Sequence, residues 1–186
     1  MALTETPTCE FGKPAPHFNL LNIDGKFLSL QDCSGEKGTL IMFICNHCPF
    51  VKAIQQKLVD TSQQLIRSGV NVVAIMSNDT EKYPEDSFEN MILDAKKWGY
   101  PFPYLLDDTQ EIAKQYGAVC TPDYFGYNSS LELQYRGRLN ATTPSRPEVA
   151  QDKQELLDAM LTIAETGKGP EQQTPSQGCS IKWKTA

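Results

Sequence analysis

The feature that most constrains the fold is a change of hydrophobic period at a pair of cysteines. Residues 39–44 form a short, almost continuous apolar run, which is typical of a strand buried on both faces of a sheet. After Cys45 and Cys48, apolar residues recur at helical spacing, and Ser68-Gly69 supplies a stop signal. A buried strand that leads directly into a helix indicates a layered α/β domain, with both thiols at the junction.

The remaining elements alternate in the same way. An Asp24-Gly25 turn between two apolar runs predicts an N-terminal hairpin extension. Further strands are expected at 70–76, 104–106, 123–128 and 131–136, and further helices at 87–98, 109–116 and from Pro147 to Glu165. Arg136 and Arg138 alternate along the last strand, and we expect both to be solvated.

This order of elements predicts one α/β domain in which helices flank a central mixed sheet. The domain is expected over residues 1–166. A polar linker and a cysteine-containing C-terminal tail are expected over residues 167–186.

Composition and charge exclude several classes of function. The chain has 186 residues, a formal charge of −6 and a pI of about 4.9. An acidic surface repels phosphate backbones, so we expect no nucleic-acid partner. No apolar run reaches the length of a membrane helix and no secretory signal is visible, so we expect no membrane contact and a cytoplasmic location. Six cysteines are too few for a disulfide scaffold, and in a reducing compartment they favour catalysis, metal binding or redox sensing.

The motif Cys45-Asn46-His47-Cys48 carries the strongest chemical signal. A turn that enters a helix brings two such thiols close enough for a disulfide, and the free N–H groups of the helix stabilise a thiolate. We therefore predict a Cys45/Cys48 redox couple, with Cys45 as the exposed, more acidic attacking thiol and Cys48 as the resolving thiol. A protonated His47 should lower the pKa of Cys45 further and make the disulfide easier to reduce.

Because of Pro49, the sequence allows two starting points for the helix. Either Cys45 is the N-cap and one helical hydrogen bond is lost, or the helix begins at Pro49 with Cys48 as its cap.

The alternative use of the two cysteines is as one half of a zinc site. A structural zinc site needs four ligands, and the sequence has no second C-x-x-C and no H-x-x-x-H motif. We therefore expect neither a metal nor an organic cofactor.

A second motif, Val119-Cys120-Thr121-Pro122, precedes the predicted closing hairpin. A C-x-x-C at a strand-to-helix junction with a later Thr-Pro resembles the thioredoxin fold. A wider set of motifs resembles the peroxiredoxin-like, AhpC/TSA-related subgroup that carries a thioredoxin-type C-x-x-C: residues 45–52, 77–79, 102–105, 110–116, 119–123, 135–138 and 178–184. The resemblance implies that Pro122 is cis and packs against both thiols, and that Thr121 pairs its backbone with an extended substrate.

Three functions remain open at this point. The first is a thiol–disulfide oxidoreductase that acts on protein or small-molecule disulfides, with an unknown thiol as electron donor. The second is a thiol peroxidase, but the resemblance places Cys45 where peroxiredoxins have a Thr, and Thr121 about where they have an Arg. The groups that polarise peroxide are therefore absent. The third is a metal carrier, but the cysteine spacing is one residue short and neither His17 nor His47 follows Pro122. We favour the oxidoreductase.

The C-terminal tail adds a further thiol. Residues 167–177 are polar, yet Ile181 and Trp183 follow, so we expect the tail to dock on the domain. Docking can bring Cys179 to the Cys45/Cys48 pair or to Cys120. Cys120 and Cys179 are therefore candidate third redox thiols, and the alternative is that the tail only covers apolar surface.

Overall fold

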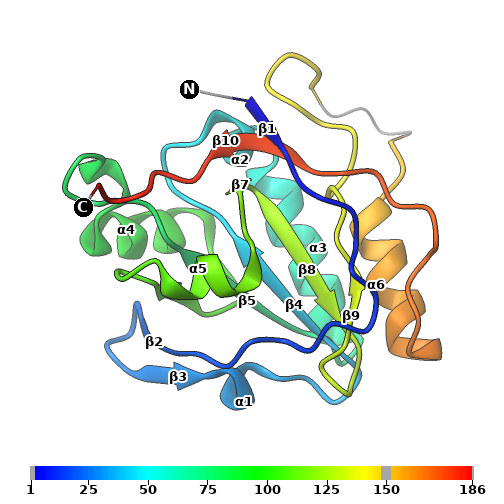
Figure 1. The fold of residues 1–186 in the computed structure, drawn as a ribbon. Coiled ribbons are helices and arrows are strands. Elements are labelled where there is room, and N and C mark those ends of the chain that lie inside the picture. Colours follow the sequence, from blue (N-terminus) through cyan, green and yellow to red (C-terminus); the bar gives the residue numbers. More distant parts are fainter. Residues whose placement is uncertain (1–2, 148–151, 186) are drawn as a thin grey trace.

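The computed structural model describes residues 3–147 and 152–185, and this part of the chain forms two sheets. The larger has the strand order β3-β2-β6-β5-β4-β8-β9, and the smaller has the order β1-β10-β7 (Figure 1). The strands are β1 Leu3–Glu5, β2 Asn19–Asn22, β3 Phe27–Ser29, β4 Thr39–Phe43, β5 Asn71–Met76, β6 Tyr104–Leu106, β7 Cys120–Thr121, β8 Asp123–Tyr127, β9 Leu133–Tyr135 and β10 Gln177–Ser180. The helices are α1 Leu30–Cys33, α2 Pro49–Ala53, α3 Gln55–Arg67, the 3-10 turn η1 Pro84–Asp86, α4 Phe88–Trp98, α5 Glu111–Tyr116 and α6 Glu155–Thr166.

The larger sheet is mixed, and its strand β4 separates two hydrophobic cores. β4 runs parallel to β5 and antiparallel to β8. All residues of β4 are buried. Leu40 and Met42 belong to one core, whereas Ile41 and Phe43 belong to the other, as the two-residue period of a strand requires. The predicted strand with two buried faces is therefore confirmed.

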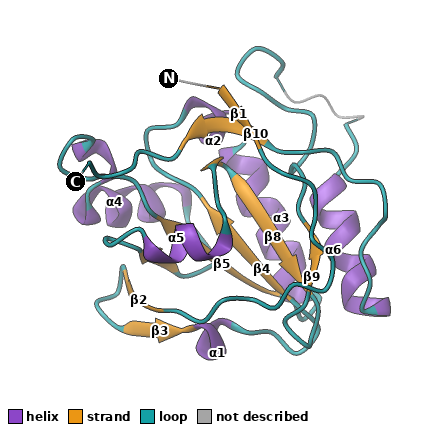
Figure 2. Cartoon of the chain, viewed as in Figure 1, coloured by secondary structure: helices purple, strands orange, loops and turns teal. Residues whose placement is uncertain are grey.

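Helices cover both faces of this sheet (Figure 2). α3, α4 and α6 pack into the first core through side chains such as Leu58, Met91 and Leu156. α1 and α5 pack into the second core through Leu30 and Ala113. The expected mixed sheet between helices is confirmed. Within the described ranges, no helix combines the length and the apolar character needed to span a membrane.

The N-terminal hairpin forms where it is expected. β2 and β3 pair antiparallel around Asp24-Gly25, and Gly25 has φ +85°, a left-handed conformation that glycine adopts at low cost. β2 also pairs with β6, so the hairpin extends one edge of the larger sheet.

The first long helix is divided, contrary to the uninterrupted helix expected up to Ser68. α2 ends and α3 begins at Ile54. The N–H of Ile54 donates to the carbonyl of Val51, three residues back, at 3.1 Å. This bond tightens the turn, and the axis of the helix restarts after it.

The last helix starts at Glu155 and not at Pro147. Arg146 donates to Asp152 from two nitrogens, at 2.6 and 3.2 Å, and residues 152–154 are not helical. Residues 148–151 of the expected helix lie outside the described residues.

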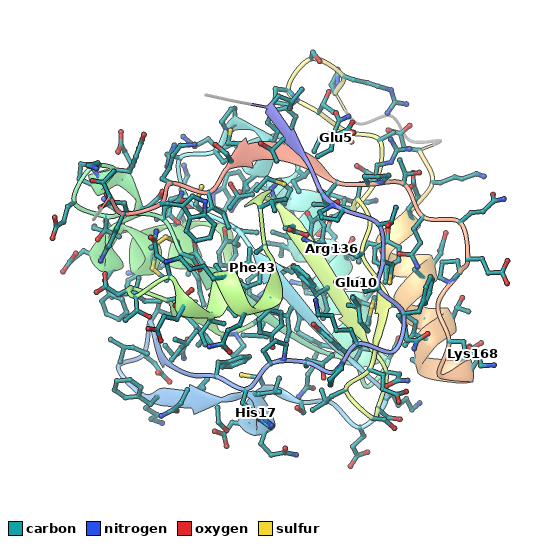
Figure 3. The ribbon with its side chains drawn as sticks, viewed as in Figure 1. Glu5, Glu10, His17, Phe43, Arg136 and Lys168 are labelled. Atoms are coloured by element: carbon teal, nitrogen blue, oxygen red, sulfur yellow. The ribbon has the colours of Figure 1, made fainter. Side chains whose placement is uncertain are left out.

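Arg136 is buried, so the prediction that it is solvated is wrong. Its Nη2 donates to Asp123 Oδ2 at 3.0 Å, and its guanidinium lies 4.5 Å from the centroid of the Phe125 ring. Figure 3 shows Arg136 within the fold. An alternating pattern along one strand cannot reveal this pair, because the buried carboxylate comes from the neighbouring strand β8.

Arg136→Met should lower the free energy of unfolding by about 3–5 kcal/mol, because it leaves the Asp123 carboxylate buried without its partner. Arg138→Met is the matched control. Arg138 binds Glu155, but its side chain is 34% exposed, so its loss should cost about 1 kcal/mol or less. Urea unfolding of both variants measures the difference. Equal losses would show that the burial of the Arg136 pair is unimportant.

The smaller sheet joins both ends of the chain to the Thr121-Pro122 segment. β10 lies between β1 and β7, with Gly178 opposite Thr4 and Cys179 opposite Thr121. In Figure 1 the terminal strands β1 and β10 lie side by side, next to β7 and the start of α2. The tail is therefore held by backbone pairing on both of its edges.

The predicted docking of the tail is confirmed, although only one of its two expected anchors is buried. Ile181 is buried, whereas Trp183 is 39% exposed and carries the Lys114 ammonium over its ring. Between them, the carbonyl of Lys182 accepts hydrogen bonds from the Asp79 N–H and from Gln110 Nε2, both at 2.8 Å. Polar contacts to the backbone fix this end of the tail.

Candidate active site

Cys45 and Cys48 lie between the end of β4 and the start of α2. Cys48 is the N-cap and Pro49 is the first helical residue, which decides between the two predicted helix starts. Proline fits this position because the N–H of the first helical residue has no partner within the helix. Both thiols are buried, with exposed fractions of 2% for Cys45 and 0% for Cys48.

The Thr121-Pro122 segment contacts both thiols. Its peptide bond is cis. In its protonated form the Cys48 thiol donates to the Thr121 carbonyl oxygen at 3.1 Å, and Cys45 Sγ lies 3.4 Å from Thr121 Oγ1. The cis bond of Pro122, implied by the family resemblance, is confirmed, and the contacts to the thiols come from its neighbour Thr121.

The backbone edge of Thr121 is already occupied. Cys179 pairs with Thr121 and Ser180 pairs with Cys120, so β10 fills the edge that was expected to take an extended substrate. Gly178 permits this close approach, since a Cβ at that position would clash with the Thr121 carbonyl oxygen. The chain therefore places its own tail where a substrate segment would pair.

The two thiols have opposite pKa shifts. A hydrogen bond from Cys45, aided by the backbone N–H groups of Val51 and Cys179, lowers the pKa of Cys48 to about 4. The hydrogen bond to Cys48, burial and the negative charge of Asp86 raise the pKa of Cys45 well above its usual range. The prediction that Cys45 is the more exposed and more acidic thiol is therefore wrong. The backbone N–H groups that favour a thiolate act on Cys48 and not on Cys45, since Cys48 directly precedes the first helical residue.

Asp86, which sequence reasoning did not single out, organises the loop that carries the thiols. Its fully buried carboxylate accepts from the backbone N–H groups of Asn46 at 2.8 Å and His47 at 3.2 Å, and from Asn78 Nδ2 at 2.8 Å. It also binds His47 Nδ1 at 2.6 Å, and this hydrogen bond raises the pKa of His47. His47 Nδ1 lies 3.9 Å from Cys45 Sγ. The negative charge of Asp86 raises the pKa of Cys45 and so opposes the lowering expected from a protonated His47. The expected acidification of Cys45 by His47 is therefore not observed.

Asp86→Asn should lower the pKa of His47 towards its ordinary value of about 6.5, because the amide carries no charge to hold the proton. Nuclear magnetic resonance titration of the histidine ring protons measures this shift. His17 is exposed (Figure 3) and is not among the hydrogen-bond partners of Asp86, so its ring signal is the internal control. An unchanged His47 titration would contradict the role given to Asp86.

Cys45, His47 and Asp86 also have ligand atoms within 4.8 Å of one another, and these donor types bind zinc. The oxygens of Asp86 already accept four N–H bonds, one of them from His47. A metal would have to displace the His47 bond. Hydrogen bonding thus accounts for the arrangement, and the described part of the chain supplies no fourth ligand to this group.

Of the two candidate third thiols, Cys179 lies beside the pair. It is buried in the same core, and it pairs with Thr121, whose carbonyl oxygen lies 3.1 Å from Cys48 Sγ. Its thiol and backbone N–H also contribute to the pKa shifts of this group. The Cys120 thiol instead donates to the Pro122 carbonyl at 3.6 Å, and burial raises its pKa. Cys33 lies in the second core, on the other face of the sheet. The structure thus brings together Cys45, His47, Cys48, Thr121, Pro122 and Cys179.

Comparison with known proteins agrees with this site. Residues 11–142 match the family described as AhpC/TSA. Thiol-disulfide oxidoreductase ResA of Bacillus thuringiensis subsp. konkukian (strain 97-27) is 26% identical over 122 residues, which cover 66% of this chain and 66% of ResA, just under two thirds of its length. A Coxiella burnetii protein named as a peroxiredoxin, bcp, is 29% identical over 117 residues, 63% of this chain and 72% of that protein. The names of both relatives indicate thiol-based redox chemistry.

Solved structures confirm the thioredoxin-like fold. The structure of an uncharacterised conserved protein from Geobacillus kaustophilus has a TM-score of 0.93 at 47% identity, over 100% of this chain and 98% of that one. Thiol–disulfide oxidoreductases of known structure at 16% identity share the fold. The architecture is therefore common to proteins that differ widely in sequence.

Proposed function

The chain belongs to the AhpC/TSA family, and we propose that within it the protein is a thiol–disulfide oxidoreductase that acts on protein or small-molecule disulfides. One observation carries the proposal: Cys48, with its lowered pKa, is hydrogen-bonded to the thiol of Cys45. A thiolate is the nucleophile in disulfide exchange, and a neighbouring thiol completes the reaction by attacking the mixed disulfide.

The reaction has two exchange steps. The Cys48 thiolate attacks one sulfur of the substrate disulfide, the substrate S–S bond breaks, and a mixed disulfide forms on Cys48. Cys45 then attacks Cys48 Sγ and forms the Cys45–Cys48 disulfide. Its proton passes to the second substrate thiolate as that group leaves. The two electrons that the substrate gains come from the thiol pair, and an external dithiol donor restores the pair.

Access to the thiols depends on the tail. Both sulfurs are buried, and β10 occupies the Thr121 edge beside them. A substrate disulfide therefore reaches Cys48 when β10 separates locally from Thr121. Strands that pair over only a few residues, as β10 does with β7, are among the parts of a fold that open most readily.

Reduction of insulin disulfides in the presence of dithiothreitol tests the proposal. Cys48→Ser and Cys45→Ser should both fall to the uncatalysed rate, because serine keeps the size of the side chain but cannot form a disulfide. Cys33→Ser removes a buried thiol from the second core and should keep the wild-type rate. Wild-type turnover in Cys48→Ser would refute the proposal.

A thiol peroxidase is the second candidate, favoured by the lowered pKa of Cys48 and by the relative named as a peroxiredoxin. The groups that lower the pKa of Cys48 are Cys45, Thr121 and two backbone N–H groups, and in the described ranges no arginine is among them. Peroxide consumption with dithiothreitol, measured alongside insulin reduction, separates the two candidates. Faster turnover of peroxide than of insulin would favour the peroxidase.

A further inference from the structure

The Cys48 sulfur has two thiol neighbours. Cys45, from the same motif, hydrogen-bonds to it on one side. Cys179, from β10, pairs with Thr121, whose carbonyl oxygen lies 3.1 Å from Cys48 Sγ, and its thiol and backbone N–H act as hydrogen-bonding partners in the pKa shifts of this group. All three side chains are buried in the same core. The C-x-x-C motif is therefore part of a cluster of three thiols.

Anchors on both sides of Cys179 hold it in this place. Before it, Ser176 Oγ donates to the Pro122 carbonyl at 2.8 Å, and the Ser176 N–H donates to Thr6 Oγ1 at 3.0 Å. After it, the Lys182 N–H donates to Asn78 Oδ1 at 2.9 Å. A cysteine that only filled space in a tail would not need this fixed approach to a second sulfur.

We propose that Cys179 is a third redox thiol, which exchanges with Cys45 for the disulfide bond to Cys48. This rests on the proposed function, since it requires the Cys45–Cys48 disulfide as its starting point. The Cys179 sulfur attacks Cys48 Sγ, the Cys48–Cys179 bond forms and the Cys45–Cys48 bond breaks. The proton of Cys179 passes to Cys45, so no electrons are gained or lost.

The position of Cys48 suits this exchange. The exchange requires Cys48 to be reached by both other thiols: Cys45 belongs to its own motif, and Cys179 pairs with Thr121, whose carbonyl oxygen lies 3.1 Å from Cys48 Sγ. The two disulfides have different consequences for the tail. A Cys45–Cys48 bond leaves β10 free to separate from Thr121, whereas a Cys48–Cys179 bond ties β10 across the site.

Oxidation of full-length Cys45→Ser with diamide tests the inference. Diamide takes two electrons and two protons from a pair of thiols, so Cys48 and Cys179 should form a disulfide. Trypsin releases Cys48 in the peptide 38–52 and Cys179 in the peptide 169–182, so the bond appears as a cross-link between these peptides. We expect this cross-link to be the dominant disulfide. It should persist when Cys33→Ser is added and disappear when Cys179→Ser is added.

Several outcomes would overturn the inference. The inference fails if Cys48 stays reduced in Cys45→Ser. It also fails if the Cys48 peptide cross-links to the peptides that carry Cys33 or Cys120 as readily as to the Cys179 peptide. Cys45→Ala, with an unchanged thermal melt, repeats the test if the serine variant folds poorly. The single variant Cys179→Ser should still form the Cys45–Cys48 disulfide. If diamide forms no Cys45–Cys48 disulfide in the wild-type protein, the proposed function fails, and not only the role of Cys179.

Discussion

At about pH 6 the reduced protein should contain one cysteine thiolate, visible by its ultraviolet absorbance, and Cys48→Ser should contain none. The pKa of Cys48 is lowered to about 4, whereas the pKa of an unperturbed cysteine thiol is about 8.5. Two pH units above its pKa, Cys48 is ionised in roughly a hundred molecules for each one protonated. An unperturbed thiol at the same pH is ionised in fewer than about one molecule in a hundred.

Further variants identify the source of this thiolate. Cys45→Ala removes the hydrogen bond that contributes most to the shift, so the pKa of Cys48 should rise in that variant. Cys33→Ser is the control and should leave the titration unchanged. A signal that disappears in Cys45→Ser and survives in Cys48→Ser would reverse the roles of the two thiols.

The same shift links stability to pH. The pKa of Cys48 in the folded state lies below its value in the unfolded chain, so its ionisation stabilises the fold fully above about pH 8.5. That contribution falls as the pH is lowered and is lost near the folded-state pKa of about 4. The difference in unfolding free energy between the reduced protein and Cys48→Ser should therefore shrink between neutral and acidic pH.

Gly178→Val should increase the rate at which iodoacetamide alkylates the Cys45/Cys48 pair by at least about tenfold, equivalent to about 1.4 kcal/mol of easier opening. A Cβ at position 178 clashes with the Thr121 carbonyl oxygen, so β10 cannot seat beside β7. Mass spectrometry of the peptide 38–52 at successive times gives the rate.

Gln177→Ala is the matched control for this experiment. Gln177 is the neighbouring residue of β10, is exposed, and directs its side chain to Glu5 and away from the thiols. It should leave the rate close to that of the wild type. If Gly178→Val alkylates no faster than Gln177→Ala, β10 is not the barrier that protects the thiols.

Local patterns were sufficient to predict most of the fold. The apolar run at 39–44 became β4 because both faces of that strand are covered. Asp24-Gly25 became a hairpin turn because glycine adopts the left-handed conformation the turn needs. The division at Ile54 lies in the backbone, where φ is −114° and ψ is 7°, and the side-chain pattern carries no signal for it.

The site was predicted in part. The pairing of a C-x-x-C with a later Thr-Pro identified Cys45, Cys48 and Pro122, since this pairing is itself a sequence pattern. Asp86 could not be identified in this way. It is one acidic residue among many, and only the folded structure buries it under four N–H donors. The acidity of Cys48 has a similar origin, because one of its donors belongs to the distant residue Cys179.

The position of β10 after the other elements of the site has a consequence for protein synthesis. The ribosome releases the chain from its N-terminus, so β4, α2 and the Thr121-Pro122 segment are made before residues 177–180. While the polypeptide is still being translated, Cys45 and Cys48 lack the strand that buries them in the finished protein. Nascent chains that do not yet contain β10 should therefore be more vulnerable to oxidants than mature molecules, because a strand made after the thiols completes their protection.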